Sequence, residues 1–514
     1  MLASGGALAQ GVTGSAVTGT ITNHENKPLP GVVVQIRNTS TGVSFTAVTG
    51  TTGSYLLDNL PPGGPYLLTA ALDGYYGHTR TGMQLVLGQR LNLDFKLLPF
   101  EAFEEEMEVV AQEVNELQDQ GRTGPSMTMD AAEMSRLPLQ GRNFTDLIAT
   151  SPQVSGNAMA GQNNRFNNIQ VDGAAYNDLF GLAGSGTPGG QANAKPISME
   201  AIQTFVVQVS PFDVRYGNFA GGMVNAVTKS GTNEFHGSLF GYGQNKLLAG
   251  KQDDPTFLGY NVWQYGASLG GPIVKDKAHF FIATDLQARK SAFGNQFQIG
   301  GVNAEDDLAR AGFTNAEADR FNRILAEKYG VNNAGTALGT ELRNPDRNVF
   351  AKISTGVIPN SYLELSYNFV GAEQDTLTRN PTAPAVPGRL RDGYQLSNSG
   401  YAQTTRTHTA RAKLTSTFLE GKLSNEFLAG FSILRDKRDP PLDIPLILVK
   451  AGRLGTNDAW LAAGTERFSQ LNKLDQDIYQ IQDSLTLAMG DHQLTAGTSN
   501  EFFKLRNAFL QAAT

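Results

Sequence analysis

The sequence NNRFNNIQVDG at residues 163–173 and the sequence GGMVNAVTKSGTNEF at residues 221–235 mark a change in the character of this chain. Before them, short β-type runs are separated by turns rich in Gly and Pro. After them, apolar and polar residues alternate over long runs, which is the period of a β-strand with two different faces. Residues 163–235 are therefore expected to join a compact N-terminal part to a large sheet.

The alternation is clearest in four runs, at residues 263–270, 363–369, 410–418 and 426–433. One face of each run is apolar and the other is polar, as in the wall of a membrane barrel with a lipid side and a lumen side. A soluble antiparallel sheet with one wet face has the same pattern. Alternation places about nine strands after residue 235. Long polar segments at 293–345 and 435–473 are expected to be surface loops, the first with a helix at 315–329.

The composition favours strands over helices. The chain has 514 residues with 57 Gly, only 17% charged residues and a mean hydropathy of -0.25. It lacks an apolar run of about 18 residues, the length that would predict a transmembrane helix. A net charge of -7 without a basic patch argues against a nucleic-acid partner. The absence of Cys excludes thiol catalysis, disulfides and thiolate metal sites.

The N-terminal region has two predicted parts. Residues 1–10 include a small-x-small sequence at Ala7, Leu8 and Ala9, so we interpret them as the remainder of a secretory signal, with an ordinary N-terminus as the alternative. Residues 15–99 contain short β runs at a spacing typical of a β-sandwich. The runs lie at 18–22, 32–37, 53–57, 66–72 and 91–97, with a loop at 60–65.

The sandwich region resembles a known family. The sequences GTI at 19–21, LPGV at 29–32, TGSY at 52–55 and LPPG at 60–63 resemble a carboxypeptidase regulatory-like domain. The resemblance implies a transthyretin-like β-sandwich, a fold also described as carbohydrate-binding-like. It assigns no ligand to the domain.

Residues 121–233 are expected to form a small α+β domain. A helix is predicted to begin at Asp130, and a second helix to cover 145–149. Residues 169–173 are predicted to form a strand that ends in a tight Asp-Gly turn. A short helix at 198–202 is expected to lead into a strand at 204–209.

This domain resembles the plug of TonB-dependent outer-membrane receptors, nearest to the Oar-like subgroup, which also carries a leading regulatory-like domain. The sequences that carry the resemblance are GRNF at 141–144, NNIQVDG at 167–173, TPGG at 187–190, SPFDVRYG at 210–217 and NAVTKSGTN at 225–233. The resemblance implies a mainly β protein with a sandwich, an α+β plug and, at 234–514, part of an antiparallel transmembrane β-barrel. Because a plugged transporter barrel has about 22 strands, we expect the chain to be an N-terminal fragment.

Residues 100–120 are rich in Glu and are expected to form an extended linker. A short β-competent segment in such a linker can add an edge strand to a partner's sheet. One tetrad resembles a TonB box, although a short apolar patch without a role has the same appearance; its residues are Glu108, Val109, Val110 and Ala111.

The resemblance implies a receptor that moves a scarce ligand, such as a siderophore, carbohydrate or peptide, across the outer membrane of a Gram-negative bacterium. Its implied partners are a TonB-type periplasmic energy-coupling protein, outer-membrane lipid and an extracellular ligand, and the sandwich would be periplasmic. The residues predicted to meet the ligand at the plug apex are Asn163, Asn164, Arg165, Tyr176 and Asn177.

Two other classes of function compete with this prediction. A surface binding or adhesion protein could have the same sandwich and β-scaffold without transport. An enzyme is not predicted, because the six His residues are scattered and H-E-x-x-H does not occur. No nucleophile elbow is found either, since the G-x-S-x-G match at 266–270 lies within one of the alternating runs. The sequence GSGTPG at 184–189 matches G-x-G-x-x-G, but Pro188 favours an irregular loop over a nucleotide site, so no cofactor is predicted.

Overall fold

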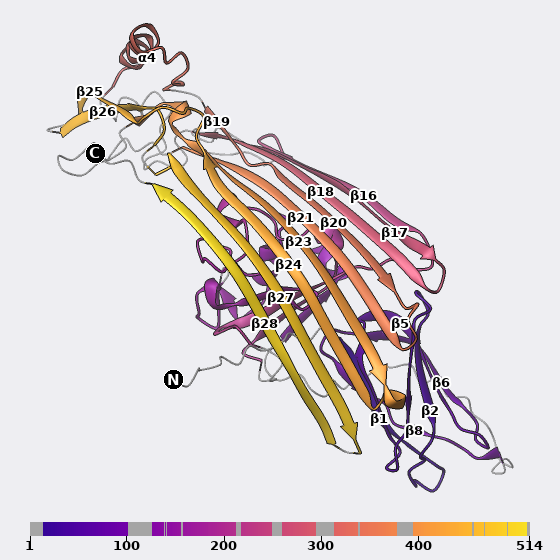
Figure 1. Cartoon of the computed structure of the whole chain (residues 1–514). Helices are drawn as coiled ribbons and strands as arrows, with labels where there is room; N and C mark the ends of the chain where they lie inside the picture. Colours follow the sequence, from indigo (N-terminus) through magenta and orange to yellow (C-terminus); the bar gives the residue numbers. More distant parts are fainter. Residues whose placement is uncertain are drawn as a thin grey trace, which may run out of the picture.

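The computed structural model describes residues 14–100, 126–137, 139, 141–155, 158–211, 217–248, 260–293, 313–337, 340–377, 394–454, 457–466, 468–490 and 492–510. These residues form a β-sandwich, a small α+β plug and a tall antiparallel wall (Figure 1). The predicted mainly β class is confirmed. The predicted signal remainder at 1–10 and the TonB-box candidate at 108–111 lie outside the described residues.

The sandwich consists of two four-stranded sheets. The first sheet has the order β4-β1-β7, with β8 also paired to β1, and the second has the order β3-β2-β5-β6. The strands are β1 (Ser15–Thr22), β2 (Val33–Asn38), β3 (Ser44–Val48), β4 (Ser54–Leu60), β5 (Gly63–Ala71), β6 (His78–Leu85), β7 (Arg90–Asn92) and β8 (Phe95–Lys96).

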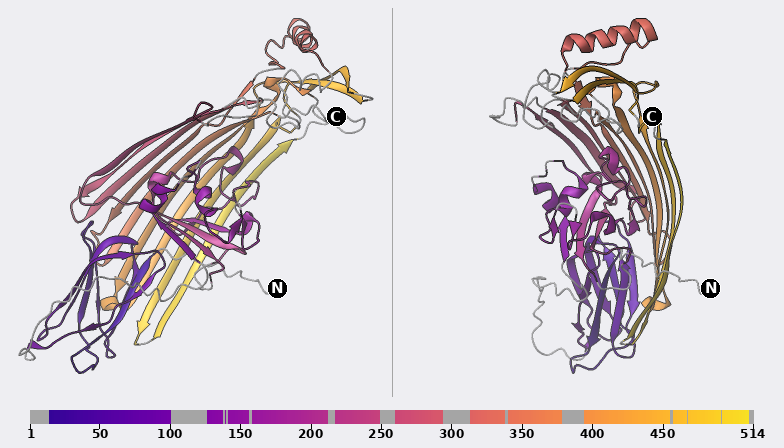
Figure 2. Two further views of the ribbon diagram at one scale, coloured as in Figure 1. Left: turned by 180° about the vertical axis from the view of Figure 1, so that it is seen from behind. Right: turned by 90° about the vertical axis from the view of Figure 1, so that its left-hand side faces the viewer.

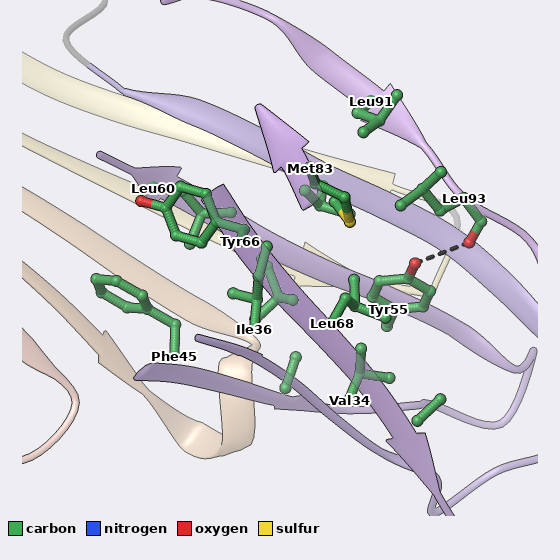
Figure 3. Packing of buried hydrophobic residues seen from close by; sticks show 14 of the residues in the cluster. Val34, Ile36, Phe45, Tyr55, Leu60, Tyr66, Leu68, Met83, Leu91 and Leu93 are labelled. Atoms are coloured by element: carbon green, nitrogen blue, oxygen red, sulfur yellow. Dashed lines mark hydrogen bonds between the residues drawn. The ribbon is translucent and has the colours of Figure 1, made fainter. Parts of the chain in front are cut away.

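The sandwich core lies between the two sheets, as Figure 3 shows for Ile36, Tyr66 and Leu68. The Tyr55 hydroxyl donates a hydrogen bond of 2.7 Å to the Leu93 carbonyl, which satisfies the one polar group of that buried ring. A Cβ at position 19 would collide with the same carbonyl, so the close approach of β1 to this segment requires glycine.

The sequence prediction was incomplete in this domain. Strands β3 and β6 were not predicted, and the predicted strand at 91–97 is two short strands, β7 and β8, each parallel to β1. The predicted loop at 60–65 is shorter, because β4 extends to Leu60 and β5 begins at Gly63. These segments have weak local signals, and pairing with strands distant in sequence stabilises them.

The sandwich should lose stability in mild acid through His78. This half-buried imidazole ring packs on the Phe95 ring, with centroids 4.6 Å apart. Burial lowers the His78 pKa below the ordinary 6.5, and the positive charge of nearby Arg80 lowers it further. The unfolded chain therefore binds the proton more readily, so stability falls as the pH drops below 6.5. We expect the melting temperature of a fragment covering 15–99 to fall between pH 7.5 and 5.5, and His78→Gln to reduce that fall. Equal falls in both proteins would contradict the prediction.

The plug has a five-stranded sheet of order β13-β12-β15-β14-β9. Its strands are β9 (Ser126–Asp130), β12 (Asn168–Val171), β13 (Ala174–Ala175), β14 (Ile202–Val209) and β15 (Gly222–Thr228), and a separate hairpin joins β10 (Val154–Ser155) to β11 (Ala158–Met159). The plug also contains three 3-10 turns, η2 (Asn164–Phe166), η3 (Gly190–Ala192) and η4 (Met199–Ala201).

Local chemistry explains the plug elements that the sequence predicted. Helix α1 (Ala131–Arg136) begins after the N-cap Asp130, whose carboxylate accepts a hydrogen bond of 2.8 Å from the Glu133 N–H. Helix α2 (Phe144–Ile148) corresponds to the second predicted helix. The Asp-Gly turn is also confirmed, since Asp172 and Gly173 both have positive φ, as a type I′ turn requires. The short helix predicted at 198–202 is the 3-10 turn η4.

The wall is a path of nine antiparallel strands in the order β16-β17-β18-β20-β21-β23-β24-β27-β28, with β19 (Thr340–Arg343) paired to β18. The strands are β16 (His236–Asn245), β17 (Tyr260–Val274), β18 (Ala278–Phe293), β20 (Asp346–Thr355), β21 (Ser361–Thr376), β23 (Tyr401–Phe418), β24 (Leu423–Asp439), β27 (Leu471–Met489) and β28 (His492–Leu510).

The predicted alternation decides the two faces of the wall. Leu365 and Tyr367 are exposed on the outer face, whereas Glu364 and Asn368 are buried on the inner face. Figure 2 shows the plug and the sandwich on the same concave side of the wall. The wall therefore has the apolar outer face and polar inner face expected of a membrane barrel, of which the described strands form part.

The two ends of the wall differ. Short connections at 275–277, 356–360 and 419–422, and Gly490 after β27, lie at one end, which we call the turn end. At the opposite loop end, helix α4 (Asn315–Tyr329) confirms the predicted helix. A small sheet lies there too, formed by β22 (Tyr394–Gln395), β25 (Ile447–Leu454) and β26 (Asn457–Ala463) (Figure 1). This sheet shares a core with α4 that includes Phe321 and Leu461. Much of the segment at 435–473, which was predicted to be a loop, therefore forms strands.

None of the helices within the described ranges is long and apolar enough to cross a membrane.

Candidate functional site: the plug apex and its contacts with the wall

The first predicted apex loop caps the 3-10 turn η2. Asn163 is its N-cap, and its side-chain oxygen accepts a hydrogen bond of 3.1 Å from the Arg165 N–H. The side chains of Asn163 and Arg165 are exposed, and Asn164 is half-buried. A Cβ at Gly186 would lie 3.1 Å from the Asn164 carbonyl oxygen, so this loop packs on the second predicted loop at 176–190. The two loops therefore form one continuous surface.

The other two predicted residues face inward. Tyr176 is buried, the Arg411 guanidinium lies 5.7 Å from its ring centroid, and burial raises the pKa of its hydroxyl to about 12. Asn177 accepts a hydrogen bond of 3.0 Å from the Ile169 N–H and donates one of 2.6 Å to the Asn167 carbonyl. Both side chains hold the apex together, and the role of the five residues in ligand contact remains a prediction.

The segment after the apex loop is fastened to the wall by side chains that the sequence did not single out. Asn193 donates to Asn344 at 3.0 Å, and the Lys195 N–H donates to Asp346 at 3.0 Å. Asn368 donates to the Pro196 carbonyl at 2.9 Å. Because inward positions of a barrel wall are commonly polar, alternation alone does not show which of them contact the plug.

Lys195 is an unusual member of this contact. Its side chain is 4% exposed, and its ammonium group has no hydrogen-bond partner among the described residues. Burial lowers its pKa, and the carboxylates of Asp285 and Asp346 act in the opposite direction. The segment thus places a buried lysine side chain between the plug and the inner face of the wall.

A second contact is a buried charge cluster formed by Asp172, Thr228, Lys352, Glu364 and Lys413. The Glu364 carboxylate lies 2.6 Å from the Lys352 ammonium and 2.7 Å from that of Lys413. Lys352 also donates to the Thr228 hydroxyl at 3.1 Å and lies 3.9 Å from Asp172. The cluster joins the Asp-Gly turn and the end of β15 to three wall strands.

The plug side of the cluster is itself preorganised. Asp172 accepts hydrogen bonds from both the N–H of Thr228, at 2.8 Å, and its hydroxyl, at 2.7 Å. Within these five residues two carboxylates face two ammonium groups, and the buried carboxylate of Glu426 also attracts the Lys413 ammonium. A buried cluster of this kind is stable only while every member keeps its partners.

The GRNF sequence makes a third contact. Arg142 lies 2.8 Å from Glu200 and donates a hydrogen bond of 2.7 Å to the Tyr242 hydroxyl. Its guanidinium also stacks over the Tyr242 ring, 4.3 Å from the centroid. This arginine therefore joins two parts of the plug to β16, the first strand of the wall.

The remaining candidate features have ordinary structures. The sequence at 184–189 forms an irregular loop before the three-residue turn η3, and no strand–loop–helix unit is built around it in the described residues. The described ranges also hold no group of three or more His, Asp or Glu side chains arranged to bind a metal ion.

Comparison with known proteins gives two domain matches. Residues 16–98 match the carboxypeptidase regulatory-like domain, and residues 227–414 match an outer membrane beta barrel domain. The chain is thus an outer-membrane protein with a leading regulatory-like sandwich and a β-barrel domain.

Two proteins of known description are similar in sequence to this chain. The chain is 30% identical over 290 residues to the TonB-dependent transporter Oar of Myxococcus xanthus, a match that covers 52% of this chain and 26% of that protein. It is 26% identical over 324 residues to a probable TonB-dependent siderophore receptor, PirA, of Acinetobacter baumannii, covering 57% and 39%. Both of these proteins are described as TonB-dependent, and the matches to this chain span about a quarter to two-fifths of their length.

A solved structure supports the fold. The outer membrane transporter YddB from Escherichia coli superposes with a TM-score of 0.51 at 12% identity, over 74% of this chain and 48% of that chain. At this identity the similarity concerns the fold alone.

Proposed function

We propose that the protein is a TonB-dependent receptor that moves a scarce ligand, such as a siderophore, carbohydrate or peptide, across the outer membrane. The observation that carries the proposal is a folded plug on the polar face of an outer-membrane wall, with its edge strand β9 as the first described strand after the acidic linker. In this proposal the loop end faces outward and the turn end faces the periplasm. The sandwich is then periplasmic.

The mechanism follows from the order of elements along the chain. The ligand binds the surface formed by the loops at 163–165 and 176–190, below the structured cap of α4 and the β22-β26-β25 sheet. A TonB-type protein pairs with the tetrad Glu108 to Ala111 and pulls on the linker. The pull reaches β9 first, and β9 is held in the plug sheet by β14 alone among the described strands. Detachment of this edge strand would start the movement of the plug.

The proposed chemistry is binding and movement rather than catalysis. The two relatives above are described as a transporter and a receptor. We infer that the chain has no catalytic activity of its own and needs no resident cofactor. Its partners are then a TonB-type protein, membrane lipid and an extracellular ligand.

Replacing Val109 with Pro should disrupt binding of the energy-coupling partner. Proline lacks the N–H that strand pairing uses, and losing one or two main-chain hydrogen bonds of about 0.5–1.5 kcal/mol each weakens binding about tenfold. Titration of the full chain with the purified periplasmic domain of a TonB-type protein measures the effect.

The matched control places proline elsewhere in the same linker, at Gln118. This variant should bind like the unsubstituted chain. Equal binding by all three proteins would reject the box assignment. Binding by none of them would favour the alternative of a surface binding protein without transport.

A further inference from the structure

The sandwich is not suspended freely beside the wall. It packs against the plug and the wall at the turn end (Figure 2). Leu87, in the connection between β6 and β7, is buried together with Val206 and Val227 on the underside of the plug sheet. Tyr362, at the start of wall strand β21, is 4% exposed and belongs to the sandwich's own core cluster. Apolar side chains of all three parts are therefore removed from water together.

The same interface holds the segment that leads from the plug into the wall. In this segment Asn233 donates its N–H to the Ser40 carbonyl of the sandwich at 2.7 Å. Its side chain donates to Asp276 at 2.8 Å and accepts from the Asp276 N–H at 2.7 Å. Arg37 of the sandwich lies 3.4 Å from the same carboxylate. Asn233 is thus fixed between the sandwich and the β17–β18 turn.

Further contacts follow the turn end of the wall. The Ser424 hydroxyl donates to Asp58 at 3.3 Å in a buried position, and the backbone at Gly421 lies against Ala47. A cavity of about 70 Å³ remains where the three parts meet, lined by polar side chains that include Lys352 and Glu364 of the charge cluster. The sandwich thus covers the side of the plug where a plug moving into the periplasm would emerge.

We propose that the sandwich is a latch whose binding partner is the underside of its own plug and the turn end of its own wall. While it is docked, it holds the segment around Asn233 and blocks the path of the plug toward the periplasm. It must separate from the wall before the plug can leave the lumen face. The inference rests on the proposed function only in requiring that the plug can move.

A disulfide can test the latch, because the chain contains no Cys. A Cβ built at Gly356, in the β20–β21 turn, lies 3.7 Å from the Val43 Cβ, close to the separation of about 3.8 Å in disulfides. The variant Val43→Cys/Gly356→Cys should therefore cross-link the sandwich to the wall on mild oxidation. Failure to cross-link in native outer membranes would overturn the docked arrangement.

The second step measures plug release without any ligand or TonB-type protein. The full-length protein is reconstituted in a planar bilayer, urea is added on the turn side to mobilise the plug, and KCl conductance is recorded. The oxidised, cross-linked Val43→Cys/Gly356→Cys variant should give at least tenfold fewer conducting events than the same variant after its disulfide is reduced. Single Cys variants should be insensitive to reductant. Equal conductance before and after reduction of a fully cross-linked sample would overturn the latch.

An undocking variant keeps the test independent of the disulfide. Leu87→Asp places a charge in the buried contact with the plug, and it should lower the urea concentration at which conduction begins. Leu98→Asp is the matched control, because Leu98 is 41% exposed on the same domain. An identical urea threshold in both variants would contradict the proposal. These recordings can fail while the Val109→Pro binding experiment succeeds, so the latch and the proposed function are tested separately.

Discussion

Replacing Glu364 with Gln is expected to lower the free energy of unfolding of the reconstituted protein by about 3–5 kcal/mol. Its carboxylate is the shared partner of the Lys352 and Lys413 ammonium groups, whose side chains are only 4% and 11% exposed. The substitution preserves shape but leaves two buried cations facing a neutral amide, and Asp172, 3.9 Å from Lys352, is too distant to compensate fully. The shift of the urea midpoint, followed by tryptophan fluorescence, measures the loss.

The control is the same substitution in an exposed ion pair. Glu341 lies 3.6 Å from Lys290, with side chains 67% and 58% exposed. Pairs of this kind contribute about 0–1 kcal/mol, so Glu341→Gln should leave the midpoint nearly unchanged. A loss below about 1 kcal/mol in both variants would mean that water screens the charge cluster as it screens a surface pair.

The second large effect concerns the core of the plug. Phe205 on β14 is 0% exposed and packs in the cluster that also contains Ile169 and Val224. Phe205→Ala removes its ring and leaves a cavity, which typically costs about 3–5 kcal/mol. The same cluster includes Phe281 and Phe350 of the wall, but Phe205 takes no part in the strand pairs of the wall, so the loss should fall mainly on the plug. Limited proteolysis should cleave the plug of the variant at lower urea, while the folded band of the wall on unheated gels persists.

Phe166 provides the matched control, since it undergoes the same change at a position that is 55% exposed. Phe166→Ala should leave the proteolysis profile unchanged. It lies beside Arg165 on the predicted ligand surface, so it also reports whether that surface tolerates substitution. Equal sensitivity of the two variants to protease would contradict a plug core organised around Phe205.

The wall was the most predictable part of the fold. Trp263 and Tyr265 alternate with Gln264 in the sequence, and they alternate between the exposed and buried faces in the structure. A strand turns its side chains through half a revolution at each residue, so the pattern specifies the face without knowledge of the neighbours. The Asp-Gly turn and the Asp130 cap were predictable for a similar reason, since each depends on the residue type at a single place.

The candidate site was predictable only in part. Asn163 and Arg165 are exposed as a ligand surface requires, but Tyr176 and Asn177 are turned inward to support the apex. Strand β9 and the small sheet at the loop end were not predicted at all. Such short strands have little local preference, and their partners come from distant parts of the chain.

The sequence by itself determined the strand period and the positions of several turns, because each of these depends on neighbouring residues. Only the tertiary structure decided that Asp172 meets Lys352 and that Asn233 lies between Ser40 and Asp276. These residues are far apart in the chain, so their meeting depends on strand register and on how the plug and the sandwich pack against the wall. The same packing brings the sandwich to the turn end, where Tyr362 of the wall joins the core of the sandwich.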